Sequence, residues 1–237
     1  MTLDDAKKEL KHALDVMLDD LDTKDDVKLC HQMLDDIKVG LNIFKPYRTD
    51  KKVSFFGSAQ LEQSHPSCLQ VKKFAHILEN HGYMTITGGG EGIMCAANDG
   101  AGEAHSFAIN IKLPEDKKQD ANHVMRQSSR YFCCHYFFTR KFFFLKESHA
   151  VVLAEGGFGT LDETFETLTL LQTGRTRKVP VVFLEEPNGC FWAPFIEQWL
   201  PHLLSEGLIH PEDADLFLHT DDLDQARAYI TGFSAFD

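Results

Sequence analysis

The sequence predicts an α/β fold: a Rossmann-like, doubly wound parallel sheet with helices on both faces, preceded by a helical extension. Short apolar runs typical of buried strands occur at residues 53–56, 83–87, 107–111, 150–154 and 180–184, with a weaker sixth run at 216–219. Helical spacing fills the intervals, at about residues 67–80, 92–104, 122–147, 160–173 and 191–205. Strands that alternate with helices in this way form parallel sheets covered on both faces.

Two amphipathic helices are predicted before the first strand. Leu3, Leu10, Leu14 and Leu21 fall at helical spacing, and the segment from Thr23 onward resembles a second helix start. We therefore expect a helical extension at residues 1–48 and a nucleotide-binding domain at residues 49–237. The extension is expected to pack either on this domain or on a partner subunit.

Composition limits the classes of function. The 237 residues, 43% of them hydrophobic, are long enough for one large core. A formal net charge of −12 argues against nucleic-acid polymers and anionic membranes as partners, since basic surfaces hold both.

The six cysteines show no CxxC spacing, so we expect no metal, no disulfide framework and no cofactor. With no signal-peptide pattern and no apolar run near the ~20 residues of a membrane span, a cytoplasmic protein is expected.

The segment AEGGFGTLDETFE, residues 154–166, places three glycines between a predicted strand and a predicted helix. Gly156 and Gly157 would supply positive φ angles and let a ligand approach the backbone. A helix that begins at Thr160 would offer unpaired amides and the positive end of its dipole to a phosphate. The turn matches neither GxGxxG nor GxxxxGK[ST], so NAD and ATP are not favoured.

The charged residues around this turn have two interpretations each. Glu163 either completes a capping box with Thr160 or faces a ligand, and Glu166 is either solvated or supports the site. Arg140 lies in a largely apolar predicted helix, where a buried guanidinium needs a partner. That partner is Glu163, Glu166 or a substrate anion, and the alternative is a surface arginine.

Two other strand exits are expected to face the same crevice. Gly57 and Ser58 follow the first predicted strand, and Gly89 and Gly90 belong to a glycine cluster after the second. Doubly wound sheets bind ligands beyond the carboxyl ends of their strands, where the strand order reverses. Ordinary turns and tight helix packing are the alternative interpretations of these two segments.

Together, six segments resemble the Lonely guy family. They are GSAQ (57–60), TGGGEGIMCAANDGA (87–101), NIKLPED (110–116), FFTRKFFF (137–144), EGGFGTLDETFE (155–166) and LTLLQTG (168–174). They follow in the order and spacing of the family over roughly residues 50–185. Family members are cytokinin riboside 5′-monophosphate phosphoribohydrolases, many of them long mislabelled as lysine decarboxylases.

The resemblance implies a homodimer or higher homo-oligomer that cleaves the N-glycosidic bond of a purine nucleoside 5′-monophosphate, either AMP or a cytokinin-type nucleotide. The products would be free base and ribose 5-phosphate. Matching the motifs residue by residue assigns Arg140 and Glu163 as the catalytic pair, without a metal or cofactor. The candidate substrate-binding residues are Gly57, Ser58, Gly89, Gly90, Arg140, Lys141, Gly156, Gly157, Gly159, Thr160 and Glu166.

Three positions depart from the residues usual in that family. Gln60 stands where arginine is usual, Cys95 where glutamate is usual, and Glu155 where proline is usual. These changes leave open a nucleotide-binding sensor or carrier without catalytic activity. Pyridoxal-dependent decarboxylation is a third interpretation, because Lys141 and Lys146 lie near the expected crevice, but no partners that would position the cofactor are recognisable.

Overall fold

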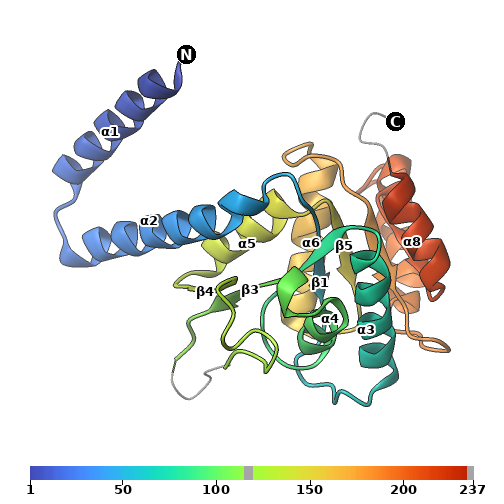
Figure 1. The fold of residues 1–237 in the computed structure, drawn as a ribbon. Helices are drawn as coiled ribbons and strands as arrows, with labels where there is room; N and C mark the ends of the chain where they lie inside the picture. Colours follow the sequence, from blue (N-terminus) through green and yellow to red (C-terminus); the bar gives the residue numbers. More distant parts are fainter. Residues whose placement is uncertain (115–119, 234–237) are drawn as a thin grey trace.

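A single parallel sheet of seven strands runs through the computed structural model, which describes residues 1–114 and 120–233 (Figure 1). The strands are β1 (Lys51–Phe56), β2 (Tyr83–Thr87), β3 (Ser106–Ile111), β4 (Tyr131–Cys134), β5 (Ala150–Leu153), β6 (Val181–Leu184) and β7 (Leu218–Thr220). Their order across the sheet is β4-β3-β2-β1-β5-β6-β7, with every neighbouring pair parallel. The chain winds outward from β1 in one direction and from β5 in the other, so the predicted doubly wound, Rossmann-like fold is confirmed.

Helices cover both faces of this sheet. They are α1 (Leu3–Asp20), α2 (Lys24–Phe44), α3 (Pro66–Glu79), α4 (Ile93–Ala101), α5 (Phe137–Glu147), α6 (Phe158–Gln172), α7 (Leu200–Ser205) and α8 (Leu223–Gly232). On one face α3, α4 and α8 bury residues such as Phe74 and Ile93, and on the other α2, α5 and α6 bury Phe44 and Phe143. None of the helices in the described residues is long and apolar enough to cross a membrane.

The helix predicted over residues 122–147 is wrong. This stretch contains the strand β4 and, after a bend, the shorter helix α5. Aromatic residues favour strands, and Tyr131 and Phe132 pair with β3 in parallel. Asp36 of α2 fixes the bend, because its carboxylate accepts from the His135 amide at 2.8 Å and from the Thr139 hydroxyl at 2.6 Å. A contact far away in sequence therefore decides where the strand ends and the helix begins.

The helix predicted over residues 191–205 is also interrupted. A π-helical turn, Phe195–Trp199, precedes α7. Pro201 explains the interruption, because a proline has no N–H to donate to the carbonyl four residues earlier. The final helix, α8, was not predicted from sequence.

The two amino-terminal helices differ in their contacts. Helix α2 packs against α5, where Tyr136 donates to Gln32 at 2.8 Å and Gly40 lies against the ring of Phe143. Helix α1 buries no residue, and Figure 1 shows it standing apart from the sheet. Its apolar residues Leu3 and Leu10 are exposed. The domain boundary at residue 48 remains a prediction.

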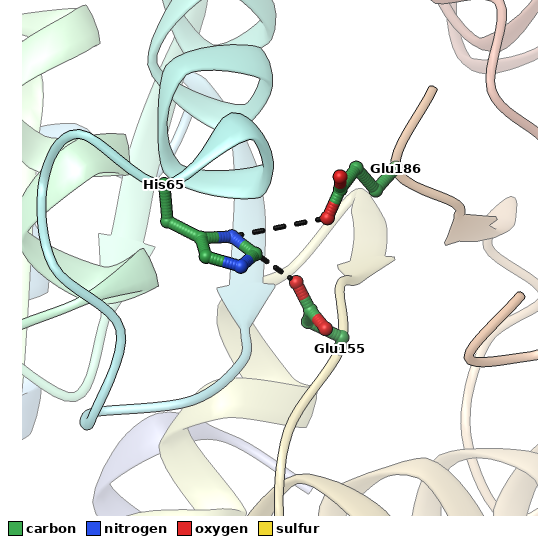
Figure 2. Close-up of side chains that lie close together, drawn as sticks. All are labelled: His65, Glu155 and Glu186. Atoms are coloured by element: carbon green, nitrogen blue, oxygen red, sulfur yellow. Dashed lines mark ion pairs between the residues drawn. The ribbon is translucent and has the colours of Figure 1, made fainter. Parts of the chain in front are cut away.

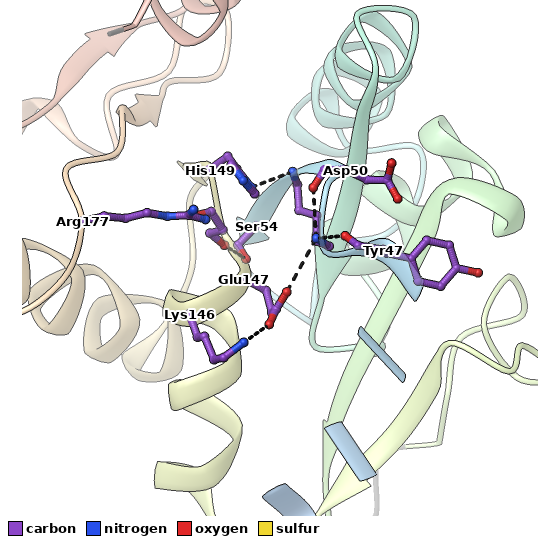
Figure 3. Close-up of polar contacts among 9 residues, drawn as sticks. Tyr47, Asp50, Ser54, Lys146, Glu147, His149 and Arg177 are labelled. Carbon is purple, nitrogen blue, oxygen red and sulfur yellow. Dashed lines mark hydrogen bonds and ion pairs between the residues drawn. The ribbon is translucent and has the colours of Figure 1, made fainter. Parts of the chain in front are cut away.

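A buried lysine links the start of β1 to the end of α5 (Figure 3). Lys52 is 1% exposed, and its ammonium donates to the carbonyls of Tyr47 at 2.5 Å and Asp50 at 3.0 Å. Its Nζ lies 3.6 Å from Oε2 of Glu147, which Lys146 also contacts. Because the ammonium has these partners, its burial is tolerated, and the central strand is fixed relative to the helix that carries Arg140.

Candidate active site

A cleft of about 280 Å³ opens beyond the carboxyl ends of β1 and β5, which are neighbours in the sheet. This is the point where the chain reverses its direction of winding, at which doubly wound sheets bind ligands. Its lining comes from three strand exits and the helices α4, α5 and α6: Phe56, Gly57, Ser58, Ala59, Gln60, Gly88, Met94, Phe137, Arg140, Gly157, Gly159, Thr160, Asp162 and Glu163. The three exits that were expected to face one crevice therefore meet in it.

The glycine-rich turn leads into α6 two residues earlier than predicted. The helix begins at Phe158, and Gly157 is its N-cap residue. The Leu161 amide donates to the Gly157 carbonyl at 3.0 Å, so the amides of Phe158, Gly159 and Thr160 precede the first helical hydrogen bond. Free amides at the positive end of a helix dipole suit an anion.

Of the two reasons predicted for the glycines of this turn, the positive φ angles are wrong, whereas open access to the backbone fits Gly157. Gly156 and Gly157 do not have positive φ angles, and Gly157 has a φ of −88°. A Cβ at Gly156 would overlap the hydroxyl of Thr160, whereas a Cβ at Gly157 or Gly159 would have no atom within 4 Å. Crowding therefore explains the first glycine. The other two leave open space beside the helix amides, on the side that lines the cleft.

Glu163 lies in the second turn of α6 and is 8% exposed. Of the two interpretations of Glu163, the capping box is absent, because the helix already begins at Phe158 and its N-cap residue, Gly157, makes no side-chain capping bond. Burial raises the pKa of Glu163 to about 7, and the charges of Lys141 and Arg140 oppose that rise. A carboxyl group with a pKa near neutrality that lines a cleft is suited to general acid–base or electrostatic chemistry.

Arg140 brings a guanidinium to the same cleft from α5. Within the described residues it forms no ion pair at 4.0 Å or less, and its buried Nε has no hydrogen-bond partner. The guanidinium carbon lies 5.3 Å from the centre of the Phe144 ring. Burial lowers the pKa of Arg140, and the negative charge of Glu163 opposes that effect. The internal salt bridge considered from sequence is therefore absent, and the guanidinium retains donors for an anion.

Lys141 points to other partners. Its ammonium lies 2.8 Å from Oδ2 of Asp162 and 3.0 Å from Oε2 of Glu166. Burial lowers its pKa, but these two hydrogen bonds together with the negative charges of Glu163 and Glu166 outweigh burial and leave the pKa above its usual value. Neither Lys141 nor Glu166 lines the cleft. Lys141 acts on the site through its charge, which lowers the pKa of Glu163.

The remaining candidate residues are divided between the cleft and its surroundings. Gly57 and Ser58 line the cleft, whereas Gly89, Gly90 and Gly156 do not. The Gly89 amide donates to the Thr87 hydroxyl at 2.9 Å, and the Gly90 carbonyl accepts from the Asn122 amide at 2.9 Å. These two glycines therefore shape the turn after β2 without reaching the cleft surface.

Sequence reasoning missed the apolar wall and the close packing around Arg140. Phe56, Met94 and Phe137 line the cleft, yet in the sequence they are indistinguishable from core residues. A Cβ at Gly88 would overlap Nη2 of Arg140, so this glycine makes room for the guanidinium. The position of Gly88 between a predicted strand and the other glycines of the cluster was the sequence signal that could have indicated this close packing.

The three positions that depart from the family differ in their relation to the cleft. Gln60 lines the cleft and is exposed. Cys95 is buried, its sulfur lies 3.5 Å from Nδ1 of His123, and burial raises its thiol pKa to about 12. Glu155 is outside the cleft lining, and its carboxylate contacts His65 and Ser67. Of the three positions, only Gln60 changes the chemistry of the cleft surface.

Comparison with known proteins gives a family match and a set of similar folds. The model of the family described as possible lysine decarboxylase matches residues 94–230, which extends past the carboxyl end of the resembling segments. No curated protein matches.

Among solved structures, the structural-genomics target TM1055 is 21% identical, over 77% of this chain and 99% of its own, with a TM-score of 0.54. The molybdenum cofactor binding protein of Rippkaea orientalis is 19% identical, over 77% of this chain and 96% of its own, at a TM-score of 0.52. The Moco carrier protein of Chlamydomonas reinhardtii is 21% identical, over 77% of this chain and 96% of its own, with a TM-score of 0.51. At these identities the likeness concerns the fold alone.

Proposed function

We propose that this chain, which belongs to the family described as possible lysine decarboxylases, is a phosphoribohydrolase acting on purine nucleoside 5′-monophosphates. It would cleave the N-glycosidic bond to give free base and ribose 5-phosphate. One observation carries the proposal: an unpaired guanidinium, a buried carboxyl group and free helix amides line the same cleft. Within the described residues no lysine lines that cleft, so nothing there supports a Schiff-base decarboxylation.

The phosphate would bind at the start of α6. The amides of Phe158, Gly159 and Thr160 precede the first helical hydrogen bond, and the space beside Gly157 and Gly159 is open. A dianion there would accept hydrogen bonds from the backbone and interact with the positive end of the helix. Holding the phosphate fixes the sugar relative to Glu163, so binding energy away from the reacting bond would orient it.

Glu163 would act on the sugar. Positive charge develops on the ribose as the base departs, and a fixed carboxylate nearby stabilises that transition state more than the ground state. Its ionised form is required for this role. The same oxygen could orient the attacking water. Since burial raises its pKa to about 7, a substantial fraction would be ionised near neutral pH.

The apolar wall of the cleft is suited to a purine. Met94, Phe56 and Phe137 provide apolar surface in the cleft lining, and Phe137 is 53% exposed, so its ring is free to contact a ligand. Arg140, without an internal ion pair, would donate to the phosphate or to the departing base. The cleft volume of about 280 Å³ is close to the lower end of the range for small-molecule sites, roughly 300–1,000 Å³.

The proposal is tested by incubating AMP with the protein and with the variant Glu163→Gln, and measuring free adenine. We expect turnover by the wild type and a loss of kcat by about 10²–10³-fold in the variant, with an unchanged fold. Glu166→Gln is the matched control, because Glu166 lies on the same helix and binds Lys141 without lining the cleft. It should retain kcat within about tenfold. A Glu163→Gln protein with full turnover would contradict the assignment.

A carrier or sensor is the second candidate, and Gln60 at the cleft surface is the observation that favours it. Two proteins of similar fold bind or carry a molybdenum cofactor, which shows that such folds also serve binding roles. Saturable AMP binding without release of adenine, equal in wild type and Glu163→Gln, would support this candidate against the enzyme.

A homodimer, or a larger assembly of such dimers, is the proposed state in solution. Phe138 and Phe142 on α5 are 51% and 48% exposed, which is unusual for two neighbouring aromatic side chains on one helix. Together with Leu145 and Leu170 they line a second surface cavity, beside Glu166. An apolar face of this kind fits a second copy of the chain, as the family resemblance implies.

A further inference from the structure

Three potential metal ligands converge outside the cleft. His65 precedes α3, Glu155 follows β5, and Glu186 follows β6. Nδ1 of His65 lies 3.4 Å from Oε1 of Glu155 and 3.8 Å from Oε2 of Glu186. Figure 2 shows the two carboxylates on the same side of the imidazole ring, each belonging to a segment that follows a separate strand. All three atoms lie within 4.8 Å of one another.

The cluster has more hydrogen-bond acceptors than donors. The Ser67 amide donates to Nδ1 of His65 at 3.3 Å, so this nitrogen has no proton for the carboxylates, and an ion bound to it would replace the amide contact. The Ser67 hydroxyl, on a side chain only 3% exposed, touches Glu155 and lies 3.1 Å from Glu186, but it has one proton to donate. The two carboxylates therefore share a single hydroxyl proton.

The negative charge of the cluster is also uncompensated. Within the described part of the chain, no lysine or arginine lies within 4.0 Å of Glu155 or Glu186. The charge of Glu155 adds to burial in raising the thiol pKa of the adjacent Cys68 to about 11. A positive charge placed between the three side chains would neutralise the two carboxylates.

We propose that His65, Glu155 and Glu186 bind one divalent transition-metal cation, with Zn²⁺ as the representative ion. Imidazole nitrogen with two carboxylate oxygens is a donor set that zinc accepts, whereas calcium requires six or more oxygens. Ligands at 2.0–2.2 Å from a tetrahedral ion are separated from one another by about 3.3–3.6 Å. The separations of 3.4 and 3.8 Å from Nδ1 of His65 are close to those values, and the ligand atoms all lie within 4.8 Å of one another.

The backbone holds the ligands in place, and solvent reaches them. Strands β5 and β6 are paired in parallel, which fixes the residues at their ends, and α3 begins next to His65. The three side chains are 34%, 26% and 24% exposed, so an ion can enter and a water can complete its coordination. The ion would anchor the chain at Glu155, directly before Gly156.

This site also accounts for Glu155, which stands where the resembling family usually has proline. Its carboxylate is directed to His65 and Ser67 and does not line the cleft. The proposal does not depend on the proposed function, because binding of the ion requires no nucleotide.

The test is a titration of chelator-treated protein with Zn²⁺, followed by calorimetry, with Co²⁺ as a spectroscopic probe of coordination. We expect one Zn²⁺ per chain and a visible Co²⁺ spectrum of tetrahedral type. His65→Asn removes the nitrogen ligand but retains a residue that is favoured at a helix N-cap, so the fold should be preserved. This variant and Glu186→Gln should each weaken binding at least tenfold.

His105→Asn is the matched control, because His105 forms a pair with Glu79 at 3.0 Å outside the cluster. It should bind Zn²⁺ as the wild type does. Absence of saturable binding would overturn the proposal and leave an ordinary His–Glu contact. Binding that survives His65→Asn but is lost after alkylation of the exposed Cys133 and Cys190 would also overturn it, because those thiols would then be the ligands.

Discussion

Replacement of Gly159 by alanine should make the protein more stable and less active. Gly159 is the second residue of α6, and a Cβ there would have no atom within 4 Å. Alanine in a helical position is more favourable than glycine by about 0.5–1 kcal/mol. A chain of 150–250 residues changes its melting temperature by about 2–4 °C per kcal/mol, so an increase of about 1–4 °C is expected.

The same methyl group would occupy the open space beside the free amides. A phosphate oxygen must come within about 2.9 Å of an amide nitrogen to accept its hydrogen bond. The methyl competes for that space, so kcat/KM for AMP should fall at least tenfold. Adenine release measures the loss, and scanning calorimetry measures the gain in stability.

Gly232→Ala is the control for this experiment, because Gly232 also lies in a helix but outside the cleft, and a Cβ added there would have no atom of the described residues within 4 Å. It should leave turnover unchanged. A Gly159→Ala protein with wild-type kcat and KM would refute the idea that the phosphate is held at this turn.

Two further substitutions test the electrostatics of the site and of the core. Lys141→Met removes the first of the two charges that lower the pKa of Glu163, so that pKa should rise above about 7. If ionised Glu163 is required, the acidic limb of the kcat/KM profile should move to higher pH, and an unmoved limb would exclude Glu163 as the titrating group. Lys52→Met leaves the buried Glu147 with Lys146 as its remaining ion-pair partner. Denaturant unfolding should therefore show that the free energy of unfolding falls by roughly 3 kcal/mol. A change below about 1 kcal/mol would mean that the buried pair contributes little.

The central strands could be predicted because both of their faces are buried. Val53, Val151 and Val182 belong to continuous apolar runs, which is the pattern of parallel strands between two layers of helices. The strand β4 could not be predicted in this way. Its four residues precede another aromatic-rich segment, and the bend between them depends on Asp36 from a distant helix.

The candidate site was predictable in part. The convergence of three strand exits follows from the parallel topology, so the positions of Ser58 and Gly157 could be anticipated. The role of Glu163 could not be decided from spacing, because Thr160 and Glu163 fit a capping box whether or not the helix begins there. The cluster of His65, Glu155 and Glu186 left no signal, since its members are far apart along the chain.

The isolation of α1 has a consequence for how the chain unfolds. Most of the stability of a helix in a protein comes from packing against other elements, and α1 buries no residue. Its capping box at Thr2 is a local contact, so it does not link the helix to the sheet. Amide hydrogens in α1 therefore exchange through local opening, while those of β1 and β5 require global unfolding. Any slowing of exchange in α1 on raising the protein concentration would report directly on contact with another molecule.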